Sequence, residues 1–382
     1  MSTQGAEKKF TNIVDTILQF YDASRSPQPE VGYLPSTISI EPTNRCNLRC
    51  LHCHHADPAH PSRQKSGFMD MAVYRKIIDE IRHWASHITL NVHGEPLLHK
   101  NIVDMVCYAK EGGLSVSLLT NATMLKPEVT HALVEARLDR IVFSFEGSCR
   151  EIHEKVRYGS KFKRTLGNIL YFMIHNQRHG TPPTFICMSM VDSMYTHEDS
   201  QAYKDYFSKL PVNTVFLNKA LNFSGTTQFG REVPVSQKIH SPFHEQPACR
   251  LPWELMTVCW DGSVSACPVD HTETHIIGNV ATESLEAIWN GERMQKFRQC
   301  HIDRDFEWIE EQGTLCSGCN ARLDDPEYDL FNSRDLVIKK IVRQAHVYSE
   351  QLAGGESTFD SSDDSSQRLA FAEEELQKNS QR

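Results

Sequence analysis

Short apolar runs alternate with amphipathic segments between residues 36 and 222. Six runs rich in β-branched and aromatic residues predict strands, at residues 36–43, 87–96, 114–121, 139–147, 184–191 and 213–218. Apolar positions at helical spacing predict helices between them, at residues 69–84, 102–110, 127–137, 162–177 and 197–210. Strands that alternate with helices indicate βα units and a parallel sheet.

The six predicted units are fewer than the eight that close a TIM barrel. We therefore expect an α/β fold, a partial (βα)6 TIM-like barrel at residues 36–223.

A helical segment at residues 1–35 precedes the barrel, with an amphipathic helix at 9–22, and the composition of residues 224–248 predicts a linker. A small β-hairpin and helix extension is expected at residues 249–325, from the run MTVCWDGSVSACP, with its Asp261-Gly262 turn, and a helix at 284–298. A C-terminal helix at 326–352 and a disordered tail at 353–382 complete the predicted organisation.

Charge and hydropathy narrow the possible partners. The formal net charge is −9, which argues against binding to nucleic acid. The sequence contains no apolar run of about 18–20 residues that could cross a membrane. The first residues lack the apolar core of a signal peptide, so a cytoplasmic location is expected.

Three of the twelve cysteines lie in one short loop after the first predicted strand. The run EPTNRCNLRCLHC places Cys46, Cys50 and Cys53 in a CxxxCxxC pattern. A [4Fe-4S] cluster takes four ligands, so three thiolates leave one iron open to a small molecule. The alternative is three buried cysteines or a zinc site, to which His52, His54 or His55 would contribute.

A second set of cysteines lies near the C-terminus. Cys249 and Cys267 flank the predicted hairpin turn, and Cys316 and Cys319 form a CxxC pair. Four thiolates suit a fully ligated iron–sulfur cluster or a structural zinc ion equally well on spacing alone. The remaining cysteines are read as buried residues, although Cys149 and Cys187 near strand ends are candidate hydrogen-atom donors. The roles of Cys259 and Cys300 stay open.

The cysteine loop and the motifs after it resemble the radical S-adenosylmethionine (SAM) superfamily. His93-Gly94-Glu95-Pro96 is similar to the family's GGEP motif, and the segment FSFEG with Ser144 is similar to its SxDG motif. The resemblance implies that Cys46, Cys50 and Cys53 hold the cluster that cleaves SAM. It also implies contacts with SAM from several residues: His52 beside adenine, Gly94, Glu95 and Pro96 at the amino group, Asn121 at the ribose, Ser144, and Arg157 at the carboxylate.

Residues 249–319 resemble the SPASM or twitch extension of that superfamily, with one auxiliary [4Fe-4S] cluster on Cys249, Cys267, Cys316 and Cys319. This cluster layout is most similar to that of the aminocyclitol (2-deoxy-scyllo-inosamine) dehydrogenases. The resemblance implies an oxidoreductase with two [4Fe-4S] clusters and SAM, which forms a 5′-deoxyadenosyl radical and oxidises a small polar or sugar-like molecule. A flavodoxin- or ferredoxin-type donor would supply the electron.

Two other functions stay open at this point. One is a maturase that oxidises, epimerises or crosslinks a ribosomally made peptide, although the residues before the first strand look too few for a leader-binding segment. The other is a non-catalytic iron–sulfur or zinc-binding protein, against which the ordered SAM motifs argue. The substrate and the oligomeric state do not follow from the sequence.

Overall fold

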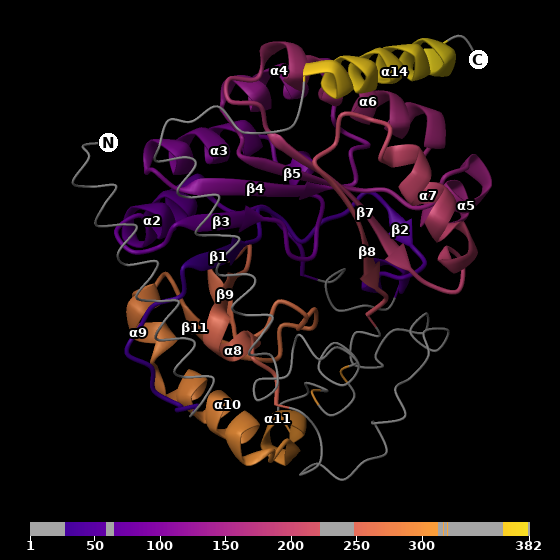
Figure 1. Ribbon diagram of the computed structural model, residues 1–382. Coiled ribbons are helices and arrows are strands. Elements are labelled where there is room, and N and C mark those ends of the chain that lie inside the picture. The colour runs from indigo at the N-terminus through magenta and orange to yellow at the C-terminus, as the bar shows by residue number, and fades with distance from the viewer. Residues whose placement is uncertain are drawn as a thin grey trace.

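Six parallel strands form the centre of the molecule in a computed structural model that describes residues 27–58, 65–221, 248–311, 316, 319 and 362–380 (Figure 1). They lie side by side in the order β1-β3-β4-β5-β7-β8. Their bounds are Thr37–Ile40, His87–Leu90, Ser115–Thr120, Arg140–Ser144, Phe185–Asp192 and Thr214–Lys219. The helices expected at 9–22 and 326–352 lie outside the described residues, as does the linker expected at 224–248 apart from its last residue.

Helices connect these strands where the sequence predicts them. Their bounds are Met71–Ile81 for α2, Ile102–Glu111 for α3, Pro127–Glu135 for α4, Phe162–His179 for α6 and Ser200–Phe207 for α7. The short helix α5 (Arg150–Val156) and the two-stranded sheet of β2 (Arg49–Cys50) and β6 (Arg157–Tyr158) were not anticipated. Short 3-10 helices follow at His54–Ala56 (η1), Pro96–Leu98 (η3) and His197–Asp199 (η4). The α/β class and the six parallel strands are confirmed.

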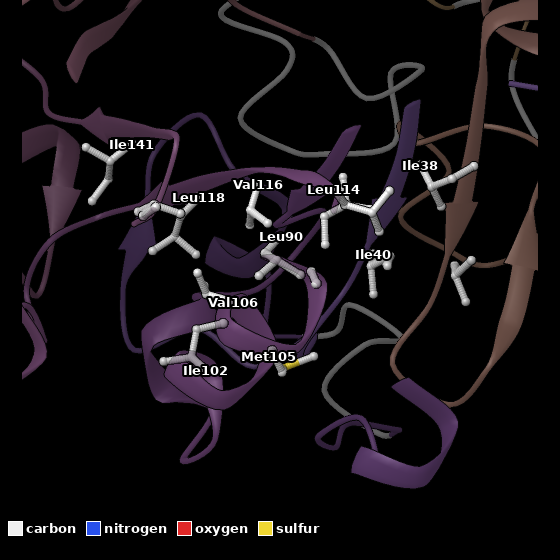
Figure 2. Close-up of a cluster of buried hydrophobic side chains, with 14 of the residues drawn as sticks. Ile38, Ile40, Leu90, Ile102, Met105, Val106, Leu114, Val116, Leu118 and Ile141 are labelled. Atoms are coloured by element: carbon white, nitrogen blue, oxygen red, sulfur yellow. The ribbon is translucent and has the colours of Figure 1, made fainter. Parts of the chain in front are cut away.

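The core lies between the sheet and its helices. Figure 2 shows side chains of the strands facing those of α3 across this layer. Each of these side chains is at most 4% exposed, and those on the strands lie on the apolar face of the sheet. They are Ile38, Ile40, Leu90, Val116, Leu118 and Ile141 on strands, and Ile102, Met105 and Val106 on α3. Burying an aliphatic side chain of this size stabilises a fold by roughly 1.5–3 kcal/mol.

The C-terminal extension continues the barrel sheet. Strand β9 (Leu255–Val258) pairs in parallel with β1, so that Thr37 lies opposite Leu255 and Ile40 opposite Val258. The predicted hairpin is formed by β9 and β10 (Ser263–Ser265), which pair in antiparallel register. The strand β11 (Ile276–Asn279), which was not predicted, pairs with β10 and completes one nine-stranded sheet. Gly262 has a φ of +85° in the turn, a conformation that suits glycine. The extension is therefore joined to the barrel through the first barrel strand.

The helix predicted at 284–298 is interrupted. Two helices occupy the segment, α9 (Leu285–Trp289) and α10 (Glu292–Asp303), preceded by α8 (Leu251–Glu254) and followed by α11 (Glu307–Glu311). The Asn290 side chain donates to the Val31 carbonyl oxygen at 2.7 Å and accepts from the Val31 amide at 3.1 Å. The single-helix prediction was wrong because Asn290 and Gly291 end α9 to make this contact with the segment before β1.

The tail prediction was also wrong for residues 362–380. They form a helix, α14 (Ser362–Ser380), which lies along α6 at the top of Figure 1. Leu369, Ala372 and Leu376 pack toward the core, and the Tyr206 hydroxyl donates to Glu375 at 2.8 Å. These apolar positions recur every three or four residues, which is a helical stripe that the polar composition of the segment obscures.

Candidate functional site

The cysteine loop lies at the carboxyl end of the first barrel strand. Cys50 is buried and belongs to β2, where it pairs with Arg157 of β6, and Cys46 and Cys53 are half-buried on either side. Burial raises the pKa of both Cys46 and Cys50 to about 12, and neighbouring thiols of the loop add to the effect. Without a metal these thiols are protonated, so binding of a cluster would release their protons.

The spacing of the three thiols fits a cluster better than a single ion. The ligand atoms of a single metal ion lie close to one another. In the described part of the chain, the Sγ atoms of Cys46, Cys50 and Cys53 do not all lie within 4.8 Å of one another. A four-iron cluster is larger and holds its thiolates farther apart. The donor set, three thiols in one loop with no fourth, therefore fits a [4Fe-4S] cluster with one open iron.

The turn after β3 is packed directly onto the cysteine loop. A Cβ atom at Gly94 would lie 2.1 Å from the Thr43 carbonyl oxygen and 2.6 Å from that of Arg45, so only glycine fits there. The Glu95 amide donates to the Arg45 carbonyl oxygen at 2.8 Å. The expected Gly94-Glu95-Pro96 motif thus sits against the loop that carries Cys46.

Glu95 joins this turn to the end of the neighbouring strand. Its carboxylate accepts from the Thr120 hydroxyl at 2.6 Å, from the Asn121 amide at 2.7 Å and from the Leu97 amide at 3.0 Å. Burial raises its pKa, although these donors oppose the shift. Most lone pairs of the Glu95 carboxylate therefore accept hydrogen bonds from the protein itself. The next residue, Pro96, begins the short helix η3.

Asn121 links the end of β4 to the cysteine loop. Its amide nitrogen Nδ2 lies 3.9 Å from the Cys46 Sγ and donates to the Asn47 side-chain oxygen at 3.0 Å. Hydrogen bonds to cluster sulfurs tune reduction potentials, so this contact bears on the cysteine loop as much as on a ribose. Ser144, the last residue of β5, is half-buried and lies opposite Ser189 of β7.

Glu146, two residues beyond Ser144, forms a buried ion pair with Arg157. The guanidinium Nε and Nη2 atoms both donate to the carboxylate, the second at 3.0 Å. His52 lies 3.8 Å from the same carboxylate. Burial and the charge of Arg157 lower the pKa of His52 to about 3. Its ring is therefore neutral, as contact with the flat adenine base requires.

The second set of cysteines also comes together. Burial raises the pKa of the Cys267 thiol well above its usual range, and the neighbouring thiols of Cys316, Cys249 and Cys319 raise it further. Cys267 follows β10, Cys249 precedes α8, and the Cys319 amide donates to the Cys316 carbonyl oxygen at 3.3 Å. The structure thus gathers the four predicted ligands from two distant parts of the sequence.

A group of histidines between the two cysteine sets was not predicted as a unit. The His54 ring lies 4.4 Å from that of His55, 5.4 Å from His93 and 5.0 Å from His271, measured between centroids. Burial lowers the pKa of His55 and of His271 to about 4, which keeps both rings neutral. The run His52–His55 was visible in the sequence, but His93 and His271 join it only through the fold.

The comparisons with known proteins agree with this geometry. Residues 40–190 match the radical SAM superfamily, and residues 249–320 match the SPASM iron-sulfur cluster-binding domain. The chain therefore contains a radical SAM domain followed by a SPASM domain. The predicted family, its SPASM-type extension and [4Fe-4S] clusters as the cofactor class are thereby confirmed.

Curated relatives align over different lengths. The chain is 33% identical over 136 residues to the AdoMet-dependent heme synthase of Methanosarcina barkeri, which is 35% of this chain and 38% of that protein. It is 26% identical to the tungsten-containing aldehyde ferredoxin oxidoreductase cofactor-modifying protein of Pyrococcus furiosus, over 75% of this chain and 87% of that one. It is 22% identical to the SAM-dependent 2-deoxy-scyllo-inosamine dehydrogenase of Niallia circulans, over 75% of this chain and 92% of that protein.

Solved structures show the same fold. Streptococcus suis SuiB bound to its precursor peptide SuiA superposes with a TM-score of 0.56 at 13% identity, over 70% of this chain and 67% of that one. At this identity the likeness supports the partial barrel and nothing finer. Among the described residues, no helix combines the length and apolar character needed to cross a membrane.

Proposed function

We propose that this protein is a SAM-cleaving oxidoreductase whose second cluster accepts an electron from the substrate. The observation that carries the proposal is the placement of Cys46, Cys50 and Cys53 in one loop, beside the Gly94 turn and the Arg157 side chain. When bound, SAM and the two clusters supply one-electron cleavage to a 5′-deoxyadenosyl radical and a later acceptor for one electron.

The residues around the loop define a place for SAM. The backbone of the Gly94 turn approaches the cysteine loop too closely for any side chain, and carbonyl oxygens of this turn would accept hydrogen bonds from the ammonium group of SAM. Arg157 uses Nε and Nη2 on Glu146, and its other guanidinium donors remain for the SAM carboxylate. The neutral His52 ring would lie beside adenine, and Asn121 and Ser144 at the strand ends would contact the ribose side.

The substrate class follows from the polarity of the same region. Buried histidines His54, His55 and His271 gather between the cysteine loop and the extension. Hydrogen-bonding groups of this kind suit a small polar molecule carrying hydroxyl or amino groups better than an apolar one. The 2-deoxy-scyllo-inosamine dehydrogenase among the relatives acts on such a molecule.

The auxiliary ligands Cys249, Cys267, Cys316 and Cys319 would saturate their cluster, which can then exchange electrons but bind no substrate. Oxidation of an alcohol to a ketone removes a hydrogen atom, a proton and an electron, and the saturated cluster suits the last of these. A flavodoxin- or ferredoxin-type protein would reduce the first cluster.

The test combines a substrate panel with a cluster variant. Anaerobically reconstituted protein is given SAM, dithionite and a panel of cyclitols and aminocyclitols that begins with 2-deoxy-scyllo-inosamine. One member of the panel should stimulate 5′-deoxyadenosine and yield a ketone. Cys267→Ala should retain uncoupled 5′-deoxyadenosine while ketone formation falls more than tenfold. A folded Cys267→Ala protein that forms ketone at the wild-type rate would rule out the electron-acceptor role.

A peptide maturase is the second candidate function. The match to SuiB with its precursor peptide favours it, because the same fold accepts a peptide in that protein. Absence of turnover with every member of the cyclitol panel, together with SAM cleavage stimulated by a candidate peptide, would support this alternative.

A further inference from the structure

A group of acidic and thiol side chains comes together without any of the predicted cluster cysteines. Ligand atoms of Glu41, Cys259 and Glu273 all lie within 4.8 Å of one another. Glu41 and Cys259 are fully buried, and Glu273 is half-buried. None of the three is used by the function proposed above as a cluster or SAM ligand.

The fold brings these residues together from separate parts of the chain. Glu41 follows β1 and Cys259 follows β9, and these strands run in parallel with Ile40 opposite Val258. The Glu41 amide donates to the Val258 carbonyl oxygen at 2.9 Å, which extends this pairing to the two ligand candidates. Glu273 reaches them from the turn between β10 and β11, so the group lies where the barrel meets the extension.

The Glu41 carboxylate is held as a ligand would be. Oε1 accepts from the amide and from the ring Nδ1 of His93, each at 3.1 Å, and Oε2 accepts from the Trp260 amide at 3.2 Å. Oε2 therefore keeps a lone pair for an ion. Carboxylates that bind metals are commonly fixed by such outer hydrogen bonds.

A buried ring nitrogen of His93 without a partner is a second observation that indicates a bound ligand. The His93 side chain is 5% exposed, and in the described part of the chain its Nε2 atom is buried without a hydrogen-bond partner. Burial lowers the pKa of this ring, but the hydrogen bond to Glu41 and the charges of Glu41, Asp270 and Glu273 outweigh it and raise the pKa. A buried ring nitrogen without a partner is costly, and the ring is held against Glu41 through its Nδ1 atom, so a water bound to an ion at this group would be a partner for Nε2.

The three groups also repel one another when they are charged, and His93 is the cationic partner of Glu41 alone. Burial raises the pKa of the Cys259 thiol well above its usual range, and Glu41 and Glu273 raise it further. The ammonium group of Lys65 does not neutralise these groups, because it donates to Asp261 at 2.5 Å and its side chain is 64% exposed. A bound divalent cation would relieve this mutual repulsion and stabilise the thiolate.

We propose that Glu41, Cys259 and Glu273 form a binding site for one zinc-like divalent cation that joins the barrel to the extension. A thiolate ligand favours zinc over magnesium or calcium, which prefer oxygen alone. With three protein ligands, a fourth position remains for water, placed near His93.

The test measures zinc directly. The full chain, anaerobically reconstituted with iron and sulfide, is incubated with zinc, desalted and analysed by elemental mass spectrometry. We expect about one zinc per chain beyond the iron, with zinc-edge X-ray absorption showing one sulfur at roughly 2.3 Å and oxygen ligands at roughly 2.0–2.2 Å. Cys259→Ser and Glu273→Gln should each weaken zinc binding more than tenfold without loss of iron.

Cys300→Ser is the matched control, because Cys300 is a buried thiol of the same domain on α10 and should keep the zinc. Glu273→Gln keeps the test decisive if Cys259→Ser does not fold, since Glu273 is only half-buried. The proposal would be overturned if wild-type protein bound no zinc, if both variants bound zinc as tightly as wild type, or if the zinc ion had four sulfur ligands. The last result would place zinc on the auxiliary cysteines instead.

Discussion

Arg157 donates through two guanidinium nitrogens to the carboxylate of Glu146, and both side chains are nearly inaccessible to solvent. Arg157 also lies opposite Cys50 in the small antiparallel sheet. One side chain therefore connects the end of β5 to the loop that carries the cluster cysteines. An isolated buried carboxylate is costly, so this pair holds the loop in place only while both partners are present.

Replacement of Arg157 should separate its two roles. We predict that Arg157→Ala lowers the free energy of unfolding by roughly 3–5 kcal/mol, because Glu146 is left buried and unpaired. It should also weaken SAM binding more than Arg157→Lys, since lysine keeps the charge but loses the bidentate geometry. Thermal melts and equilibrium dialysis with labelled SAM measure the two effects, with the exposed Arg150→Ala as control. Equal SAM affinity in all variants would remove Arg157 from the SAM site.

Gly94 offers a test of how closely the turn after β3 must approach the cysteine loop. Gly94→Ala would place a Cβ atom 2.1 Å from a backbone oxygen, so the turn and the loop must separate. We predict more than tenfold weaker SAM binding and reduced iron loading. Gly32→Ala is the matched control, because a Cβ there meets nothing within 4 Å. Wild-type SAM affinity in Gly94→Ala would show that the turn does not contact the ligand.

Burial of His153 predicts a loss of stability on acidification. Its ring is fully buried, contacts the Glu146 carbonyl oxygen at 2.9 Å and the Ser160 hydroxyl at 2.8 Å, and burial lowers its pKa from 6.5 to about 4. The unfolded chain therefore binds one more proton than the folded chain between about pH 6.5 and 4. The stability is fully present above that range and is lost as the pH falls through it.

The expected loss between about pH 7.5 and 5.5 is about 1 kcal/mol from this group. His153→Gln cannot titrate, so its melting temperature, although lower overall, should fall less than that of wild type over the same pH change. Parallel decreases in wild type and variant would show that His153 does not contribute to the pH dependence.

The barrel and both cysteine sets could be predicted because their signals are local or strongly constrained. Strand and helix periodicity is carried by neighbouring residues, and the spacing of Cys46, Cys50 and Cys53 specifies one loop. The contacts of β9 with β1 could not be anticipated, since they join residues more than 200 positions apart. For the same reason the grouping of Glu41 with Cys259 and Glu273 appears only in the fold.

The errors have physical causes of their own. A continuous helix was expected through Asn290, but its side chain is committed to Val31 and ends α9. The segment around Leu369 was read as disordered from its polar composition, whereas its apolar stripe finds a partner surface on α6. In both cases a tertiary contact decided the local structure.

Metal content tests the number of clusters. Three cysteines in one set and four in the other predict about eight irons per chain after anaerobic reconstitution. Replacing Cys316 and Cys319 by Ala should halve the iron and leave an electron paramagnetic resonance signal that responds to SAM. About four irons together with one zinc bound by four sulfurs in wild type would instead indicate a structural C-terminal site.

The most direct measurement is the formation of 5′-deoxyadenosine from SAM under reducing, anaerobic conditions. Reconstituted wild-type protein should form it, and the variant with Cys46, Cys50 and Cys53 all replaced by Ala should form none while its auxiliary cluster remains visible by spectroscopy. The result that would contradict the account is 5′-deoxyadenosine from the triple variant at the wild-type rate, or none from wild-type protein that carries its full iron content.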